Sequence, residues 1–342
     1  MKWERGRMRI LAAAGALAAL AVLMLSTLLP VTAAADGGQA FSIAPPLLSL
    51  KTDPGKTVIA EIRLTNVSNG PMIMSAQAND FAAKDENGDP NIILNTSDSV
   101  PFSLREWVQL PAPFTLASKQ TKTLEIPIAV PASGEPGGHY GVIRFTGTAP
   151  GANGTGVSLS ASIGTLVLLQ VSGNLQERAS LADFYSANAQ FTKKSSFQYG
   201  PVNFVTRVSD DGNIHLQPTG TITVKNLIGQ KVATLRVNGD PSSATDIPKN
   251  ILPSSIRRFQ NTLNKKWLFG RYTARLDLTY GQDHKHLTAN VSFWVIPYAI
   301  IVPAIIGLLI IAFGLRFGIR RYNAHIIKKA QGSAGRREPP TV

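Results

Sequence analysis

The residues best suited to form a binding site lie in a short acidic segment. This segment, residues 85–89, reads Asp-Glu-Asn-Gly-Asp. Its side-chain oxygens recur at alternate positions, as they do in a Ca²⁺-binding loop. Such a loop has a bidentate glutamate at its twelfth position, and the corresponding residue counted from Asp85 is Thr96. The Asn-Gly pair is itself a strong turn signal. The sequence therefore favours a solvated β-turn over a Ca²⁺ site.

The histidines offer a second possible metal site. His284 and His286 are two positions apart, which would place both imidazoles on one face of a strand. The chain has no cysteine, and Asp283 is the nearest acidic partner, so a polar hairpin end is the favoured interpretation. His139 and His215 are interpreted as residues that support turns or the core. We predict that the protein holds no metal.

The sequence contains no signature of a known catalytic site. It has no G-x-S-x-G nucleophile elbow, no H-E-x-x-H zinc motif and no phosphate-binding glycine loop. Carboxylates such as Asp80, Asp85 and Glu106 cannot be paired by spacing alone across a β-fold, which leaves glycosidase chemistry open. We predict a protein that is not an enzyme, with no catalytic residue and no cofactor.

Basic residues between the two ends of the chain are densest from position 257 to position 275. They are Arg257, Arg258, Lys265, Lys266, Arg271 and Arg275. We take the first four as candidate contacts to an anionic wall polymer, to lipid phosphate or to an acidic partner protein. The alternative interpretation is a solvated loop that binds nothing.

The net charge of +13 resembles a nucleic-acid signal until it is divided along the chain. Residues 1–35 contribute +3 and residues 316–342 contribute +6, so only +4 remains for residues 36–294. Most of the basicity therefore flanks the two apolar ends, where it attracts anionic lipid and sets membrane topology. The distribution argues against a nucleic-acid partner.

Both ends of the chain are apolar and suited to a membrane. Residues 10–29 follow four basic residues, and Ala33 and Ala35 fit a signal-peptide cleavage site; an uncleaved anchor is the alternative. Residues 295–315 form a second apolar run, which at roughly 31 Å could cross the hydrocarbon core. Basic residues follow this run, so the positive-inside rule predicts a cytoplasmic C-terminus and an extracytoplasmic middle, with one span or two.

The region between these ends has the period-two alternation of β-strands. In residues 58–64 and 272–280, apolar positions alternate with polar ones, and turn residues separate such runs. Pro127 suits an edge strand or a bulge, and residues 226–229 suit a hairpin turn. Residues 256–268 are the irregular stretch, for which a loop or a short helix is expected. Frequent short strands without helical periodicity predict an all-β ectodomain of two immunoglobulin-like β-sandwich domains.

Charge divides this region into two parts, with net −3 over residues 36–172 and net +7 over residues 173–294. Without cysteine, each part needs its own apolar core, and such exported domains are typical of a monoderm bacterial surface. The predicted organisation is a signal segment (1–35), two sandwiches (36–172 and 173–294), a transmembrane helix (295–317) and a basic cytoplasmic tail (318–342).

Several segments resemble bacterial WxL-interacting cell-surface proteins. In the first part these are residues 41–45, 64–66, 85–89 and 137–143, and in the second part residues 213–220, 251–259, 269–272 and 293–297. The resemblance implies two immunoglobulin-like domains with a C-terminal anchor. It also implies a first domain associated with peptidoglycan and a second domain that engages host or partner proteins.

These observations predict a non-catalytic, membrane-anchored bacterial surface protein that binds cell-wall polymer, partner proteins or both. Binding would use sheet edges and loops, including addition of a strand from the partner. An extracytoplasmic assembly or export factor of chaperone type is the first alternative. A wall-modifying enzyme is the second.

Overall fold

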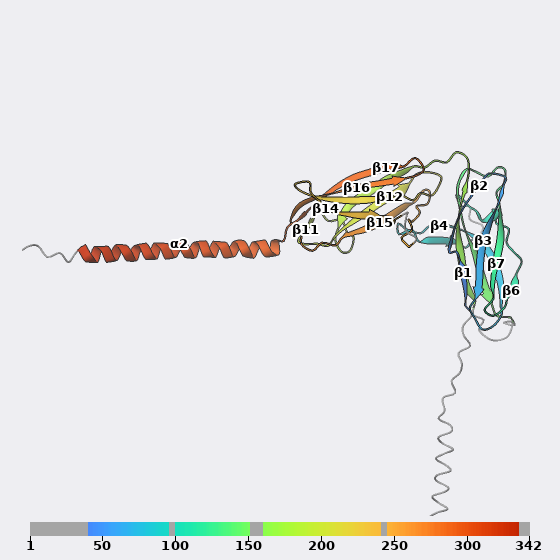
Figure 1. Ribbon diagram of the computed structural model, residues 1–342, viewed down its shortest axis with the longest axis horizontal. Helices are drawn as coiled ribbons and strands as arrows, with labels where there is room; N and C mark the ends of the chain where they lie inside the picture. The colour runs from blue at the N-terminus through green and yellow to red at the C-terminus, as the bar shows by residue number, and fades with distance from the viewer. Residues whose placement is uncertain (1–39, 96–99, 151–159, 241–244, 335–342) are drawn as a thin grey trace, which may run out of the picture.

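The computed structural model describes residues 40–95, 100–150, 160–240 and 245–334. The candidate cleavage residues Ala33 and Ala35 lie outside these ranges. Within them the chain folds into β-sheets followed by a long apolar helix (Figure 1), which confirms the predicted β-rich chain with an apolar C-terminal helix.

Two of the described sheets face each other across the first core. The three-stranded sheet has the order β1 (Phe41–Ala44), β3 (Thr57–Asn66) and β7 (Thr121–Ala129). The six-stranded sheet has the order β2 (Leu47–Thr52), β9 (Ala161–Val171), β8 (Gly137–Thr148), β4 (Met72–Ala83) and β5 (Pro90–Ile93), with β6 (Phe114–Leu116) also on β4. A 3-10 turn, η1, covers Arg105–Trp107.

Alternation along β3 explains this packing. Ala60, Ile62 and Leu64 are fully buried, while the residues between them are exposed, so one face of the strand meets the opposite sheet. Pro127 lies in β7, which is an edge strand, as predicted. An edge strand can accommodate proline because one of its sides needs no hydrogen-bond donors. We call the unit formed by these two sheets the first sandwich.

The second sandwich has the same two-layer plan. One described sheet has the order β10 (Ala179–Ala187), β12 (Val202–Asp210) and β15 (Ile256–Leu263). The other has the order β11 (Ser196–Phe197), β17 (Lys285–Val295), β16 (Gly270–Tyr280), β13 (Thr219–Asn226) and β14 (Lys231–Val237). Its core includes Phe204 and Phe293, whose ring centroids are 5.7 Å apart.

One expected element was wrong. Residues 256–268 were expected to form a loop or a short helix, but Ile256–Leu263 is strand β15, paired antiparallel with β12. The polar pair Arg257-Arg258 and the run Gln260-Asn261 hide the alternation. The strand forms because β12 offers a continuous partner and because both arginines find acceptors elsewhere in the fold.

The apolar helix α2 covers Tyr298–Ala334. It begins three residues later than the predicted transmembrane segment, because Val295 still belongs to β17 and is fully buried in the second core. Its Tyr298–Ala324 part is long and apolar enough to cross a membrane, and the mean hydropathy reaches 2.6 over an 18-residue window within it. The helix then continues into the basic region that was expected to be a tail.

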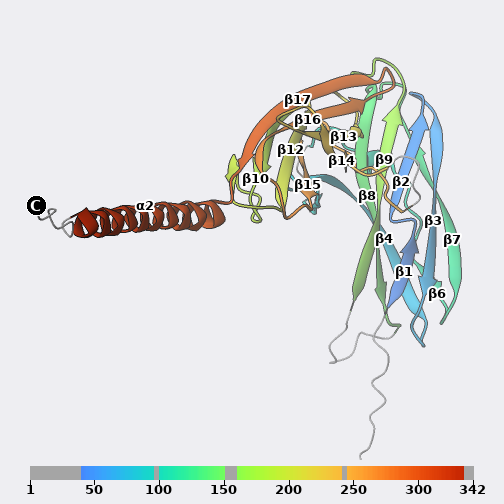
Figure 2. The same cartoon turned by 60° about the vertical axis from the view of Figure 1, so that its left-hand side comes forward.

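The two sandwiches meet end to side, so the chain bends at their junction. The first sandwich lies across one end of the second, and α2 leaves from the opposite end of the second (Figures 1 and 2). The first sandwich and α2 thus lie at opposite ends of the second sandwich.

Candidate functional site

The first part of the site is an open sheet edge on β9. Strand β8 pairs with β9 along residues 161–171, whereas β2 pairs with it only along residues 166–171. Residues 161–165, which we call the open β9 edge, therefore have one strand neighbour among the described residues. The cause is local. Residues 41–44, which precede β2, are not paired with β9; they belong to the other sheet, where β1 pairs with β3.

Within the described ranges, backbone groups of the open β9 edge have no strand partner on the β2 side. The N–H of Leu166 donates to the carbonyl oxygen of Pro46, 3.0 Å away on the β2 side. Alternate residues of a strand direct their N–H and C=O groups to the same side. The backbone groups of Ser162 and Gly164 therefore point toward that side too, beyond the end of β2. An unpaired strand edge of this kind is a template for another extended chain.

An apolar side chain accompanies these groups. Ile163 stands on the same face of β9 as Val167, Leu169 and Val171, which are buried in the first core. Ile163 is nevertheless 40% exposed, although its cross-strand neighbour Phe145 is fully buried. The sandwich is thus open beside Ile163. A chain that paired with this edge could also cover an apolar side chain that faces inward.

The second part of the site is the junction between the sandwiches, where two motifs from the sequence meet. The 85–89 loop joins β4 to β5 and reaches β12 and β15 of the second sandwich. The Glu86 carboxylate accepts a hydrogen bond from Arg207 Nε at 2.9 Å and pairs with Nη2 of the same residue. Arg258 donates from its backbone N–H to the Glu86 carbonyl oxygen and from Nη2 to Asn87 Oδ1, at 2.6 and 2.8 Å.

Arg257 reinforces this contact. Its guanidinium donates to the carbonyl oxygens of Asn250 and Asn87, at 2.6 and 2.9 Å. Burial lowers the pKa of Arg257. Gly88 has φ +79°, and a Cβ there would stand 2.3 Å from Arg257 Cζ, so both the turn and the arginine require glycine at this position.

The same contacts bear on the Ca²⁺ question. In the 85–89 loop the Asp85 side chain accepts the N–H of Asn87 at 2.8 Å, and the Asp85 carbonyl accepts the N–H of Gly88 at 3.2 Å. The loop is therefore a hydrogen-bonded turn. Hydrogen bonding by Arg207 holds the pKa of Glu86 below its usual value. No group of three or more His, Cys, Asp or Glu side chains converges within the described ranges.

A neutral aromatic contact forms the other half of the junction. Tyr140 of β8 is buried between Phe81 and Phe102 and accepts the backbone N–H of His215 at 2.8 Å. Burial raises the pKa of Tyr140 and lowers that of His215 to about 4, so both groups are uncharged at neutral pH. Leu252 of the second sandwich packs against the same cluster. The junction therefore combines an apolar socket with the charged Glu86–Arg207 pair.

The remaining histidines have ordinary structural roles. Both ring nitrogens of His139 contact carbonyl oxygens, of Ser103 at 3.2 Å and of Glu135 at 2.9 Å. His284 lies in the turn before β17, and His286 Nδ1 is 3.0 Å from Asp277 Oδ1.

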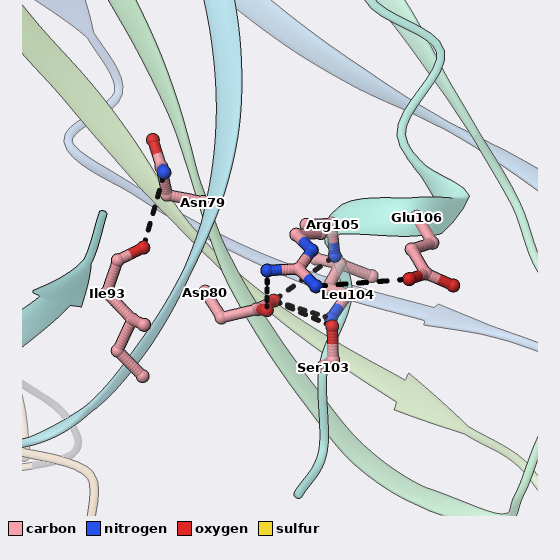
Figure 3. Close-up of polar contacts among 7 residues, drawn as sticks. All are labelled: Asn79, Asp80, Ile93, Ser103, Leu104, Arg105 and Glu106. Atoms are coloured by element: carbon pink, nitrogen blue, oxygen red, sulfur yellow. Dashed lines mark hydrogen bonds and ion pairs between the residues drawn. The ribbon is translucent and has the colours of Figure 1, made fainter. Parts of the chain in front are cut away.

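A buried carboxylate braces the first sandwich beside the junction (Figure 3). Asp80 of β4 is 1% exposed, and its Oδ1 accepts hydrogen bonds from Ser103 Oγ and from the backbone N–H groups of Leu104 and Arg105, at 2.8, 3.2 and 3.3 Å. Arg105 Nη1 is 3.5 Å from Asp80 Oδ2. All these partners belong to one connecting segment, so Asp80 holds that segment against β4.

The four predicted basic residues are not brought together. Arg257 and Arg258 lie at the junction and contact the 85–89 loop, whereas Lys265 and Lys266 follow β15 and lie at the end of the second sandwich near α2. Sequence reasoning missed the open β9 edge. Nothing in the sequence of residues 161–171 indicated that β2 would cover only part of the strand.

Comparison with known proteins finds solved structures with a similar fold. No protein-family model and no curated protein matches the chain. Several solved structures do. They include the YadV chaperone (12% identity, 74% of this chain, 99% of that chain, TM-score 0.35). A second is the CupB2 chaperone of Pseudomonas aeruginosa (11% identity, 74% of this chain, 100% of that chain, TM-score 0.32). A third is the Salmonella enterica SafA pilin in complex with the SafB chaperone (11% identity, 75% of this chain, 96% of that chain, TM-score 0.33).

Proposed function

We propose that this chain is a non-catalytic, membrane-anchored extracytoplasmic protein that holds an extended segment of a partner polypeptide on the open β9 edge. It would serve as an assembly or export factor of chaperone type for surface proteins. The supporting observation is that residues 161–165 have a free backbone edge beside the exposed Ile163. Immunoglobulin-like sandwiches of the kind inferred for WxL-interacting proteins would suit the same role.

The geometry favours a polypeptide ligand for two reasons. The outward N–H and C=O groups of Ser162 and Gly164 match the backbone of a β-strand, and hydrogen bonds of this kind are independent of the partner's sequence. The exposed Ile163 adds a contact to apolar side chains, which recur at alternate positions of a strand. Anchoring through α2 with the sandwiches outside the cytoplasm would place this edge where exported chains emerge.

Ser162→Pro provides the test, because it removes an outward N–H and leaves the hydrogen bonds to β8 intact. Ser162→Ala is the matched control, since it also removes the hydroxyl but keeps the N–H. We expect Ser162→Pro to lower partner capture at least about ten-fold relative to Ser162→Ala, because a strand-addition contact depends on its backbone hydrogen bonds. Capture is measured by photo-crosslinking from position 163 in producing cells.

A second crosslinking position supplies the specificity control. Ile73 is as exposed as Ile163, at 40%, but it lies on β4 and is paired on both sides, with Thr115 of β6 and Thr148 of β8. Crosslinks from position 163 should exceed those from position 73 and should map to alternate residues of an extended partner segment. Equal capture from both positions, or from both Ser162 variants, would remove the support for strand addition.

One observation favours a second function, binding of an anionic wall polymer. A polar cavity of about 430 Å³ in the second sandwich is lined by Arg236, Lys249, Arg257 and Arg258, among others. Arg258 Nε faces no partner within the described part of the chain. Cationic side chains around a polar hollow can hold phosphate or carboxylate groups.

Arg258→Gln tests this second function. It should weaken co-sedimentation of the protein with purified cell wall at least about ten-fold at low salt, the lower end of what one charge-assisted hydrogen bond contributes. The loss should fade as salt is added. Arg271→Gln is the control, because Arg271 is an exposed cation on β16, outside the cavity. Equal binding by both variants would argue against the cavity as the polymer site.

A further inference from the structure

The end of the second sandwich from which α2 leaves carries exposed aromatic side chains. Trp267 and Phe269, in the connection from β15 to β16, are 72% and 70% exposed. Tyr199 in the connection from β11 to β12, Trp294 near the end of β17 and Tyr298 at the start of α2 are exposed as well. We call these five residues the aromatic collar. Exposed large aromatic side chains at one end of a domain mark a contact surface.

Backbone contacts hold the collar beside the helix. The N–H of Gly200 donates to the carbonyl oxygen of Lys266, and the N–H of Ile296 donates to that of Phe197, at 3.0 and 2.8 Å. A hollow of about 300 Å³ is lined by Tyr199, Lys266 and Trp267 together with Pro297, Ala299 and Ile300. Two collar residues therefore line the same hollow as the first turn of α2.

The length of α2 sets the depth of this turn in a membrane. The 18 residues from 298 to 315 carry no charge, and Arg316 follows them. At about 1.5 Å per residue they measure roughly 27 Å, close to the roughly 30 Å of a hydrocarbon core. If α2 spans the membrane, Arg316 lies at one boundary and Tyr298 at the other. The collar then lies at the level of the lipid headgroups.

The side chains of the collar suit that depth. Tryptophan and tyrosine prefer the interface between hydrocarbon and water, where a ring is buried and a polar group stays hydrated. Lys266 Nζ is 5.6 Å from the centroid of the Trp267 ring, and Lys265 precedes it. A lysine beside an interfacial ring can reach lipid phosphate while the ring contacts acyl chains.

We propose that the aromatic collar docks into the outer leaflet of the membrane that α2 crosses, and so holds the second sandwich against the lipid surface. The proposal rests on the membrane anchoring in the proposed function. A docked collar would restrict tilting of the β-structure about Pro297. The first sandwich, at the far end of the second, would then stand away from the bilayer (Figure 2).

The test is lipid quenching of tryptophan fluorescence in the full chain, reconstituted into vesicles of phosphatidylcholine and phosphatidylglycerol. Bromine atoms are placed either near the headgroup or near the middle of the acyl chains. With Trp3, Trp107 and Trp294 replaced by phenylalanine, Trp267 is the sole fluorophore. We expect the shallow bromines to quench it at least two-fold more than the deep bromines, and aqueous iodide to quench it weakly.

Two further variants make the outcomes distinguishable. Phe313→Trp, in a chain whose other tryptophans are phenylalanine, reports on α2 and should be quenched best by deep bromines. Quenching at position 313 without quenching of Trp267 would refute the collar but leave the anchor intact; quenching at neither position would refute both. Strong iodide quenching of Trp267, or protection of Trp267 from both quenchers by a second protein copy, would also overturn docking.

A single substitution guards against misfolding of the multiple variant. In the otherwise unchanged chain, Trp267→Ser should reduce the quenching by shallow bromines, which Trp294 of the collar still undergoes, whereas Trp107→Phe should leave it unchanged. Trp107 lies in the first sandwich, packed on His139 with ring centroids 4.2 Å apart. If Trp267→Ser and Trp107→Phe reduce shallow quenching equally, the proposal fails.

Discussion

Asp80→Ala is expected to lower the free energy of unfolding of the first sandwich by about 3–5 kcal/mol, the usual result of removing one partner from a buried ion pair. The change leaves the guanidinium of Arg105 without its carboxylate, 3.5 Å away in the native protein. It also leaves the Ser103 hydroxyl and two backbone N–H groups without their acceptor. Chemical denaturation with hydrogen exchange in β4 and β8 would measure the loss.

Glu106→Ala is the matched control for Asp80. Glu106 is the other carboxylate near Arg105, 3.9 Å away, but its side chain is exposed. Exposed ion pairs contribute at most about 1 kcal/mol, so this variant should unfold almost as the native protein does. Similar losses for both variants would show that the buried network does not brace the 103–105 segment. Asp80→Asn, which keeps an acceptor oxygen, should fall between the two.

Asp210→Asn is expected to stabilise the second sandwich above pH 7, by up to about 4 kcal/mol. Asp210 is fully buried, and burial raises its pKa from 3.8 to about 7. Its Oδ1 accepts the N–H of Gly212 at 2.9 Å, which asparagine can also do. Asp210 Oδ2 has no hydrogen-bond partner within the described residues. An amide thus replaces a carboxylate whose charged form is poorly solvated.

The sign of the pH dependence follows from proton linkage. Between about pH 4 and pH 7 the folded protein keeps a proton on Asp210 that the unfolded chain has released. The free energy of unfolding therefore falls as the pH rises through this range, and the loss is complete above pH 7. His215, with its pKa lowered to about 4, contributes the opposite slope up to about pH 6.5. The difference between Asp210→Asn and the native protein isolates the aspartate.

Thermal and chemical unfolding between pH 4 and pH 8 would check this prediction. Asp211→Asn is the control, because hydrogen bonds from Ser180 and Ser209 lower the pKa of the exposed Asp211. That variant should lose a little stability at neutral pH. A constant difference between Asp210→Asn and the native protein across the pH range would mean that Asp210 is not protonated in the folded state.

Parts of the fold could be predicted because burial leaves a short-range pattern. The alternation in residues 58–64 and 272–280 depends on neighbours along the chain, and β3 and β16 follow it. Strand β15 could not be recognised in this way. Arg257 and Arg258 interrupt its pattern, and they are compatible with a strand only because Asn87 and Asn250 supply acceptors.

The candidate site depended on contacts between distant residues. Glu86 and Arg207 are 121 positions apart, and Tyr140 and His215 are 75 apart. The acidic loop and the basic pair were each recognised as unusual in the sequence, but as unrelated features. Their contact arises from docking of the two sandwiches. No local pattern encodes that docking, because it depends on the relative positions of surfaces built from many strands.

The sequence by itself determined that the chain is rich in β-strands, has no disulfide and carries an apolar C-terminal helix, because composition and periodicity record what each segment must bury. The tertiary structure alone decided which edges and side chains stay uncovered. Residues 161–165 are an open edge because β2 begins at Leu47, opposite Leu166 of β9. Trp267 lies beside the candidate membrane helix because the β15–β16 connection reaches the first turn of α2. Exposure depends on neighbours in space, which sequence alternation does not specify.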